Sequence, residues 1–107
     1  MFMSEILVRI KRAVLDGRYE FSEKASVELE ADGLTERDAI ESILNAMAIY
    51  KTLRSTSQHR RSSGERLYVI QSANLDGLLV YTKGKLVSEA GVETFYFLIS
   101  SKRAQYQ

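Results

Sequence analysis

The segments RLYVIQS (residues 66–72), LLVYTK (78–83) and FYFLISSK (95–102) decide the fold, because apolar and polar side chains alternate along each of them. Alternation with a period of two is typical of β-strands whose two faces meet different surroundings. We therefore expect a sheet with one buried and one exposed face. The predicted buried face consists of Leu67, Val69, Leu78, Val80, Phe95, Phe97 and Ile99. The predicted exposed face carries tyrosines and cations, namely Arg66, Tyr68, Tyr81, Lys83, Tyr96 and Lys102.

The face with tyrosines and cations is a candidate surface for RNA. Any base can stack on an aromatic ring, and every phosphate is attracted to a fixed positive charge. Tyr68, Tyr81, Tyr96 and Lys102 are therefore candidate RNA-binding residues. Tyrosine also fits a half-buried strand with its hydroxyl group in water, so such a face occurs in sheets that bind no ligand. The pattern alone leaves both interpretations open.

The first half of the chain predicts three helices, each preceded by a residue that can cap it. Ser4, Ser22 and Thr35 are the expected N-cap residues, and Thr35 with Asp38 resembles a capping box. The third helix has an apolar stripe, which we assign to packing. The stripe consists of Ala39, Ile40, Ile43, Leu44 and Met47.

The second half predicts strands. Residues 49–53 and the three segments quoted above are the expected strands, with a polar and mobile loop at 54–64 and another loop at 84–93. A further short extended piece lies at 19–21. Helices that precede an antiparallel sheet form an α+β fold. We predict a single domain over residues 1–107, with about three N-terminal helices packed on the apolar face of a four-stranded, mainly antiparallel sheet.

The composition is that of one globular domain, with 107 residues of which 45% are hydrophobic and 27% are charged. The absence of cysteine excludes disulfides and thiolate metal sites and favours a cytoplasmic protein. Glu5 and Arg9 interrupt the first apolar stretch, so we predict no signal peptide and no membrane partner. His59 is the only histidine and no phosphate-binding glycine motif is present, so we predict no metal and no cofactor.

Charge is distributed unevenly along the chain. Residues 1–53 carry seven Lys and Arg against ten Asp and Glu, whereas residues 54–107 carry eight against four. The second half is therefore the candidate for binding an acidic partner. Its polar loop contributes candidate RNA-binding residues, although a solvated loop without a ligand has the same composition and its histidine need not be catalytic. These residues are Arg54, His59, Arg60 and Arg61.

The motifs SEKA (22–25) and GLTERDA (33–39), the strand at 66–70 and an ending with Phe, Tyr, Ile, Ser, Lys and Arg resemble a bacterial family of small proteins. This family is related to the BrnT and RelE toxins of type II toxin and antitoxin pairs, and the resemblance covers about residues 18–104. It implies a compact α+β fold, cleavage of free or ribosome-associated mRNA, and a cognate antitoxin that covers the basic face. The family pattern has histidine where this chain has Lys24, which argues against histidine-based catalysis.

For a toxin of this kind the resemblance implies RNA cleavage without a metal, in which the ribose 2′-hydroxyl group attacks the adjacent phosphate. A base must accept the first proton, cations must stabilise the phosphate, and an acid must protonate the leaving oxygen. Lys24, Lys83 or Tyr106 could transfer protons if their surroundings assisted it. Arg66 and Arg103 suit charge stabilisation, because guanidinium stays protonated and binds phosphate with a planar fork.

Two other functions are compatible with the same residues. A non-catalytic binding module would dock an acidic protein or a nucleic acid through the basic face. A homodimer formed through this face is disfavoured, because Arg66, Lys83 and Lys102 would place charge at the centre of the interface. We make no prediction of the oligomeric state.

Overall fold

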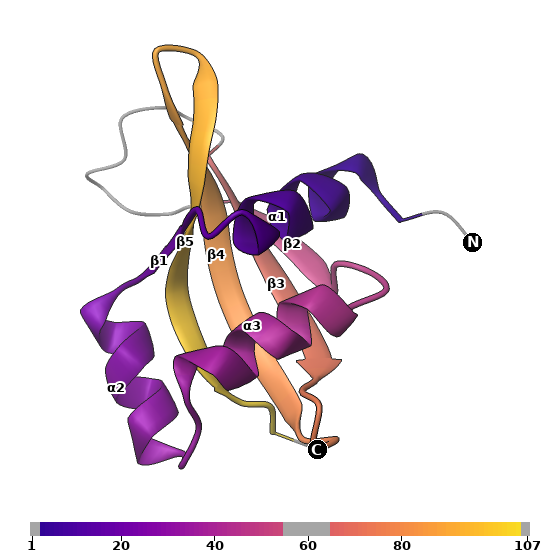
Figure 1. Ribbon diagram of the computed structural model, residues 1–107, viewed down its shortest axis with the longest axis vertical. Helices are drawn as coiled ribbons and strands as arrows, with labels where there is room; N and C mark the ends of the chain where they lie inside the picture. The colour runs from indigo at the N-terminus through magenta and orange to yellow at the C-terminus, as the bar shows by residue number, and fades with distance from the viewer. Residues whose placement is uncertain (1–2, 55–64, 106–107) are drawn as a thin grey trace.

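The computed structural model describes residues 3–54 and 65–105. Helices α1 and α3 cross one side of a sheet, and α2 lies beside its edge (Figure 1). The predicted α+β class, with helices on a sheet, is confirmed. In the described ranges the elements are α1 (Glu5–Leu15), β1 (Tyr19–Phe21), α2 (Glu23–Ala31), α3 (Glu36–Asn45), β2 (Lys51–Arg54), β3 (Arg66–Ala73), β4 (Leu79–Glu89) and β5 (Val92–Arg103).

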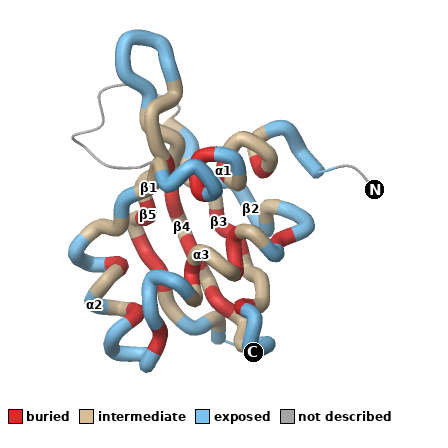
Figure 2. The backbone as a smooth tube through the Cα atoms, in the orientation of Figure 1, coloured by how far each residue is buried: buried red, intermediate tan, exposed pale blue. Residues whose placement is uncertain are grey.

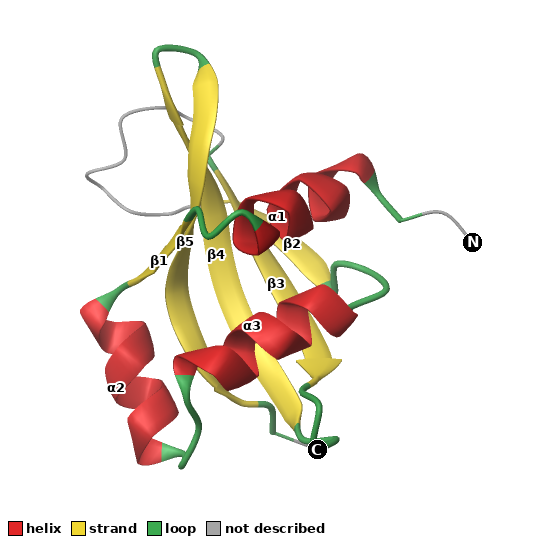
Figure 3. Cartoon of the chain, viewed as in Figure 1, coloured by secondary structure: helices red, strands yellow, loops and turns green. Residues whose placement is uncertain are grey.

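The sheet contains five strands in the order β1-β5-β4-β3-β2. All neighbouring strands are antiparallel except β1, which pairs in parallel with β5 (Figure 3). The long chain between β1 and β5 allows this parallel pairing. The predicted number of four strands is wrong, because residues 19–21 join the sheet as an edge strand.

Each helix begins at the cap residue that the sequence predicts. Ser4 Oγ and Ser22 Oγ each accept a hydrogen bond from a backbone N–H in the first turn, at 3.2 and 3.0 Å respectively. Thr35 and Asp38 form a complete capping box. The predicted packing role of Met47 is wrong, because α3 ends before this residue and its side chain is 64% exposed.

The main core lies between α1, α3 and the sheet (Figure 2). Lys11 joins the two helices, because its Nζ atom donates to Leu44 O at 2.9 Å and also to Ala46 O. Carbonyl groups at the end of a helix lack helical partners, so a cation is favourable there. Burial lowers the pKa of Lys11. The buried core residues are Leu7, Ile10, Ala13, Val14, Ile43, Ala46, Ile70, Tyr96 and Leu98.

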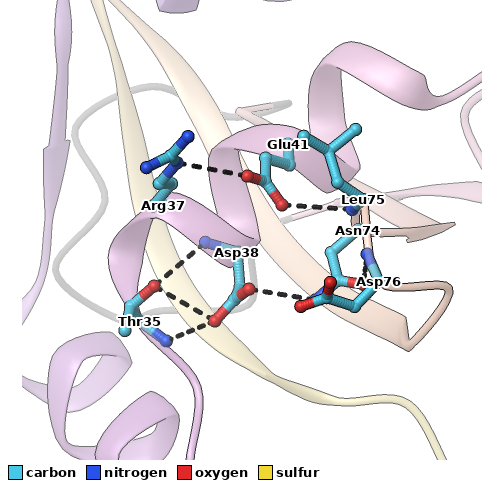
Figure 4. A network of polar contacts seen from close by, with 7 residues as sticks. All are labelled: Thr35, Arg37, Asp38, Glu41, Asn74, Leu75 and Asp76. Atoms are coloured by element: carbon cyan, nitrogen blue, oxygen red, sulfur yellow. Dashed lines mark hydrogen bonds and ion pairs between the residues drawn. The ribbon is translucent and has the colours of Figure 1, made fainter.

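A polar network ties α3 to the turn between β3 and β4 (Figure 4). The Asn74 side chain donates to Asp38 Oδ1 at 2.9 Å, and Leu75 N donates to Glu41 Oε1 at 3.1 Å. Asn74 Oδ1 also accepts hydrogen bonds from the backbone of the turn itself. The pKa of Asp38 is lowered, chiefly by the backbone N–H of Thr35 and further by the Asn74 amide, and these effects outweigh burial.

Strands β4 and β5 form a hairpin that projects beyond the rest of the sheet (Figure 1). The predicted loop at residues 84–93 is therefore wrong, because both strands continue until only Ala90 and Gly91 form the turn. Both turn residues have a positive φ, 52° and 79° respectively, as a two-residue hairpin turn of this kind requires. Arg9 of α1 pairs with Glu93, which lies one residue pair from the turn, and so ties the hairpin to the helix.

The register of the strands corrects the two predicted faces. Val69 points away from the helices, whereas Val80 packs toward α2 and α3, although the sequence pattern places both on one face. Alternation divides the residues of one strand between its two sides, but the register of pairing decides which residues of the next strand share each side. Each predicted face therefore mixes both sides of the sheet. The partners on the helix side include Tyr68↔Gly84, Ile70↔Thr82 and Leu86↔Tyr96, and those on the other side include Val69↔Lys83, Tyr81↔Lys102 and Lys85↔Phe97.

Tyr96 has 0% exposure, so the prediction that it lies on an exposed RNA-binding face is wrong. Its ring lies over Gly84 of the neighbouring strand. A Cβ atom on Gly84 would come within 2.6 Å of Tyr96 Cζ and within 2.8 Å of Phe97 O. Glycine is required here by close approach of another chain segment. Burial raises the pKa of Tyr96.

We predict that Gly84→Ala lowers the free energy of unfolding by about 3 kcal/mol, because the new methyl group overlaps a buried ring and a backbone carbonyl. Gly17→Ala is the control, since Gly17 has a φ of 75° and open space beside it. The control should cost only about 1 kcal/mol, the strain of a left-handed alanine. Urea unfolding followed by circular dichroism measures both losses. Equal losses would contradict the packing of Tyr96 on Gly84.

We predict that Asp38 makes the stability depend on pH in the acid range. Its pKa is lower in the folded than in the unfolded chain, so its contribution is fully present above the unfolded value of about 3.9. The contribution is lost as the pH falls through the lower folded value. In urea unfolding at decreasing pH, the parent should therefore lose more stability below about pH 4 than Asp38→Asn does. A parallel decline in both proteins would refute a role for this charge.

Candidate nucleic-acid interface

The side of the sheet away from α1 and α3 carries lysines and aromatic rings, and we call it the lysine face. The register aligns these residues across the strands. Lys51 and Lys83 lie on either side of Val69 as its partners, and Lys85 is the partner of Phe97. The lysine face is formed by Lys51, Tyr81, Lys83, Lys85, Phe95, Phe97 and Lys102, and each of these residues is at least partly exposed.

Acidic groups adjoin the lysine face at several points, and one of them is Glu28 of α2, whose charge interacts with that of Lys102. Glu20 of β1 is a register partner of Phe97 and shares its side of the sheet. Glu65 Oε2 lies 3.4 Å from Lys85 Nζ, and both of these side chains are about one third exposed. None of these acids forms an ion pair with Lys51, Lys83 or Lys102 in the part of the chain that the structure describes. The face therefore keeps a positive excess.

Tyr81 and Lys102 lie together toward one end of the lysine face. They are register partners, and Lys102 Nζ is 5.4 Å from the centroid of the Tyr81 ring, within the range of a cation–π contact. They border a cleft of about 190 Å³. The amide, phenol and cationic groups of this cleft can hydrogen-bond to phosphate oxygens and base edges. The cleft is lined by Gln71, Tyr81, Lys102, Arg103, Ala104 and Gln105.

Helix α2 positions the last part of β5 through two carboxylates. Glu28 Oε1 accepts hydrogen bonds from Ser100 Oγ at 2.7 Å and from Ser101 N at 3.2 Å. Asp32 Oδ2 accepts one from Arg103 N at 2.8 Å. These backbone groups lie on β5 beyond its pairing with β1, so the carboxylates replace a neighbouring strand there. The position of Lys102 thus depends on α2.

Glu28 also sets the electrostatics of the cleft. Burial raises the pKa of Glu28, but hydrogen bonds from Ser100 and Ser101 and the charges of Lys24 and Lys102 outweigh burial, so the net shift is downward. The pKa of Tyr81 is raised, first by burial and then by the negative charge of Glu28. The Tyr81 phenol therefore keeps its proton at neutral pH. It can donate a hydrogen bond or a proton, but it is poorly suited to act as a base.

The structure brings together four of the sequence-predicted site residues: Tyr81, Lys83, Lys102 and Arg103 lie on the lysine face or line its cleft. Lys24 lies on α2, where its Nζ atom is 3.5 Å from Glu28 and its side chain is 62% exposed. Lys24 therefore affects the cleft only through its ion pair with Glu28.

The structure separates other predicted site residues from the lysine face. Arg66 and Tyr68 leave β3 on the helix side, and Tyr68 packs against the main core. Arg54 is the register partner of Arg66 and also lies on the helix side. The predicted surface that joined these residues to Lys83 and Lys102 is therefore wrong. His59, Arg60, Arg61 and Tyr106, like the predicted loop at 54–64 after its first residue, lie outside the described residues.

Sequence reasoning missed Lys51, Lys85, Gln71 and Glu28. Alternation continued through Gly84 joins Lys85 to Lys83, whereas the predicted loop at 84–93 separates them. The role of Glu28 has no local signal, since it depends on α2 lying beside β5.

Residues 3–54 and 65–105 contain no group of three or more His, Cys, Asp or Glu side chains placed to hold a metal ion. In the same ranges no helix combines the length and apolar character needed to cross a membrane. A scan of the sequence against models of known protein families found no match, and a search among curated proteins also found none. The resemblance to BrnT and RelE toxins therefore stays a prediction.

We predict that Glu28→Gln lowers the pKa of Tyr81 without returning it to the ordinary tyrosine value. The substitution removes the negative charge but leaves the burial of the ring, which is the larger cause. NMR titration of the protein with ¹³C-labelled tyrosine, from neutral to alkaline pH, measures this pKa. Glu23→Gln, on the exposed first turn of the same helix, is the control. An unchanged Tyr81 pKa in Glu28→Gln would contradict the coupling.

Proposed function

We propose that this protein binds single-stranded RNA through the lysine face and acts as a toxin-like protein of the RelE and BrnT kind. The main support for this proposal is the contact between Lys102 and the Tyr81 ring, which lies beside a polar cleft. Both residues are on the side of the sheet that α1 and α3 leave open (Figure 1). A cation and an aromatic ring at one place suit a phosphate and its neighbouring base. A RelE-like fold and a cytoplasmic location belong to the same proposal.

The geometry of the lysine face supports binding along a strand of RNA. Lysines on β2, β4 and β5 lie on one side of the sheet, where they can follow a run of phosphates. Phe95 and Phe97 lie on the same side as half-buried rings that offer stacking area. This combination favours contacts with the RNA backbone and with the planes of the bases. We therefore expect only a weak preference for particular RNA sequences.

Metal-independent cleavage of mRNA is the finer part of the proposal, and the structure revises its roles. The protonated Tyr81 phenol suits the acid that protonates the leaving oxygen. Lys102 and Arg103 suit stabilisation of the phosphate, because they line the cleft beside that phenol. Lys83, on the same face, is the remaining described candidate for the base. Arg66 has no part in this set, since it lies on the helix side.

The cognate antitoxin of this proposal is an acidic protein that covers the lysine face. The second candidate function, a non-catalytic binding module, uses the same surface without cleaving RNA. A cation beside an aromatic ring can bind a phosphate and a base without any proton transfer, which favours this second candidate.

We predict that Lys83→Ala and Lys102→Ala each weaken RNA binding and each lower the slope of log affinity against log salt by about 0.7, the value for one phosphate contact on a single strand. Fluorescence anisotropy with a labelled single-stranded RNA, at several salt concentrations, measures both quantities. Arg12→Ala is the control, because Arg12 is an exposed cation on α1 and lies on the other side of the molecule.

The same RNA, incubated and analysed for 2′,3′-cyclic phosphate ends, separates the two candidate functions. Binding with cyclic ends that disappear in Tyr81→Phe supports cleavage. Binding without such ends identifies the binding module. A parent protein whose RNA affinity is unaffected by Lys83→Ala and Lys102→Ala would refute the proposal for the lysine face.

A further inference from the structure

A second cleft lies where the projecting hairpin meets α1 and the start of β3. Its volume is about 430 Å³, which is within the range of small-molecule sites. Arg9, Arg66 and Lys85 contribute cations to its wall, and Tyr68 and Leu86 contribute apolar surface. Arg66 and Tyr68 leave the sheet on the side opposite to Lys83 and Lys102, and of the lysine face only Lys85 also lines this cleft.

Most charges at this cleft already have partners. Arg9 and Glu93 form a two-contact ion pair, with Arg9 Nε at 3.1 Å from Glu93 Oε1. Lys85 Nζ lies 3.4 Å from Glu65 Oε2. Arg66 is exposed, and none of the ion pairs among residues 3–54 and 65–105 includes it. Arg66 is thus the cation of this cleft that is open to an anion.

The neighbour of Arg66 across the sheet is another arginine. Arg54 and Arg66 are register partners, so their side chains leave the sheet on the same side with Cβ atoms about 5 Å apart. Like charges directly opposite each other on a sheet are destabilising. Residues 55–65 connect the two arginines, and the one acid in their sequence is Glu65, whose carboxylate lies 3.4 Å from Lys85 Nζ. None of the ion pairs among residues 3–54 and 65–105 joins this acid to Arg54 or Arg66.

We propose that Arg66 and Arg54 bind a phosphate monoester whose organic part rests in the cleft against Tyr68 and Leu86. A monoester carries close to two negative charges and three free oxygens, so it can accept hydrogen bonds from two guanidinium forks. A carboxylate carries one charge and two oxygens, which matches one fork only. The volume and the apolar wall suit a body of nucleoside size. The monoester is either a free nucleotide or the 5′ end of an RNA.

Binding of adenosine 5′-monophosphate to the full chain, measured by calorimetry, tests this proposal. The parent should bind the nucleotide, and Arg66→Gln should weaken its affinity by roughly tenfold or more, the loss expected for a charge-assisted hydrogen-bonded contact. Arg66→Lys keeps the charge but removes the fork, so its affinity should fall between the two. Arg12→Gln, at an exposed cation of α1, should leave the affinity unchanged.

Folding is monitored in the same samples by thermal unfolding. Removal of one of two like charges should keep or raise the Tm of Arg66→Gln, and saturating nucleotide should raise the Tm of the parent more than that of the variant. An affinity that is equal in parent and Arg66→Gln, or that is absent in the parent, would overturn the proposal.

Two short RNAs that differ only in a 5′-phosphate or 5′-hydroxyl end distinguish the sources of the monoester. A preference for the phosphorylated RNA that disappears in Arg66→Gln identifies an RNA end. Nucleotide binding without such a preference identifies a free nucleotide. The inference is independent of the lysine face: if Lys83→Ala and Lys102→Ala leave RNA affinity unchanged while Arg66→Gln loses the nucleotide, the proposed function fails and this site stands.

Discussion

The packing of the Tyr96 ring on Gly84 is the constraint on which the arrangement of the sheet depends. The ring belongs to the main core beneath α1 and α3, and it occupies the space that any side chain at position 84 would fill. This contact holds β4 and β5 in the register that pairs Leu86 with Tyr96. Because side chains alternate, Lys83 and Lys85 must then point to the opposite side. The position of the lysines thus follows from packing on the face that they do not occupy.

The helices were predictable from the sequence, and the faces of the sheet were not. Ser4, Ser22 and Thr35 each accept a hydrogen bond from a backbone N–H three residues further along the chain. A local pattern is therefore enough to identify them. The strands carry large apolar residues on both sides, as Ile70 and Val69 show, and therefore give no single preference for the core. The relative phase of β3 and β4 is a property of their pairing, which alternation along one strand cannot determine.

The candidate site was predictable only in part, for the same reason. Tyr81, Lys83 and Lys102 belong together because register joins β4 to β5, whereas alternation along single strands also groups them with Arg66, Tyr68 and Tyr96. Tyr96 has the same residue type as Tyr81 but belongs to the core. The one local signal that separates these two tyrosines is Gly84, since a glycine inside a strand marks the close approach of another group. The predicted loop at 84–93 places Gly84 outside the strand, so this signal is lost.

The uneven distribution of charge has a structural cause as well as a functional interpretation. Several acids of the first half act as hydrogen-bond acceptors for the second half. Asp38 and Glu41 bind the turn after β3, and Glu28 and Asp32 bind backbone N–H groups of β5 that β1 does not reach. These carboxylates are thereby held at the edge and at one end of the sheet. Strands β2, β4 and β5 keep lysines on the helix-free side, and β2 and β3 carry an arginine pair on the other. A lysine ammonium group is a point charge that suits a run of phosphates, whereas paired guanidinium forks suit one terminal phosphate, so the two sides of this sheet differ in the anions that they favour.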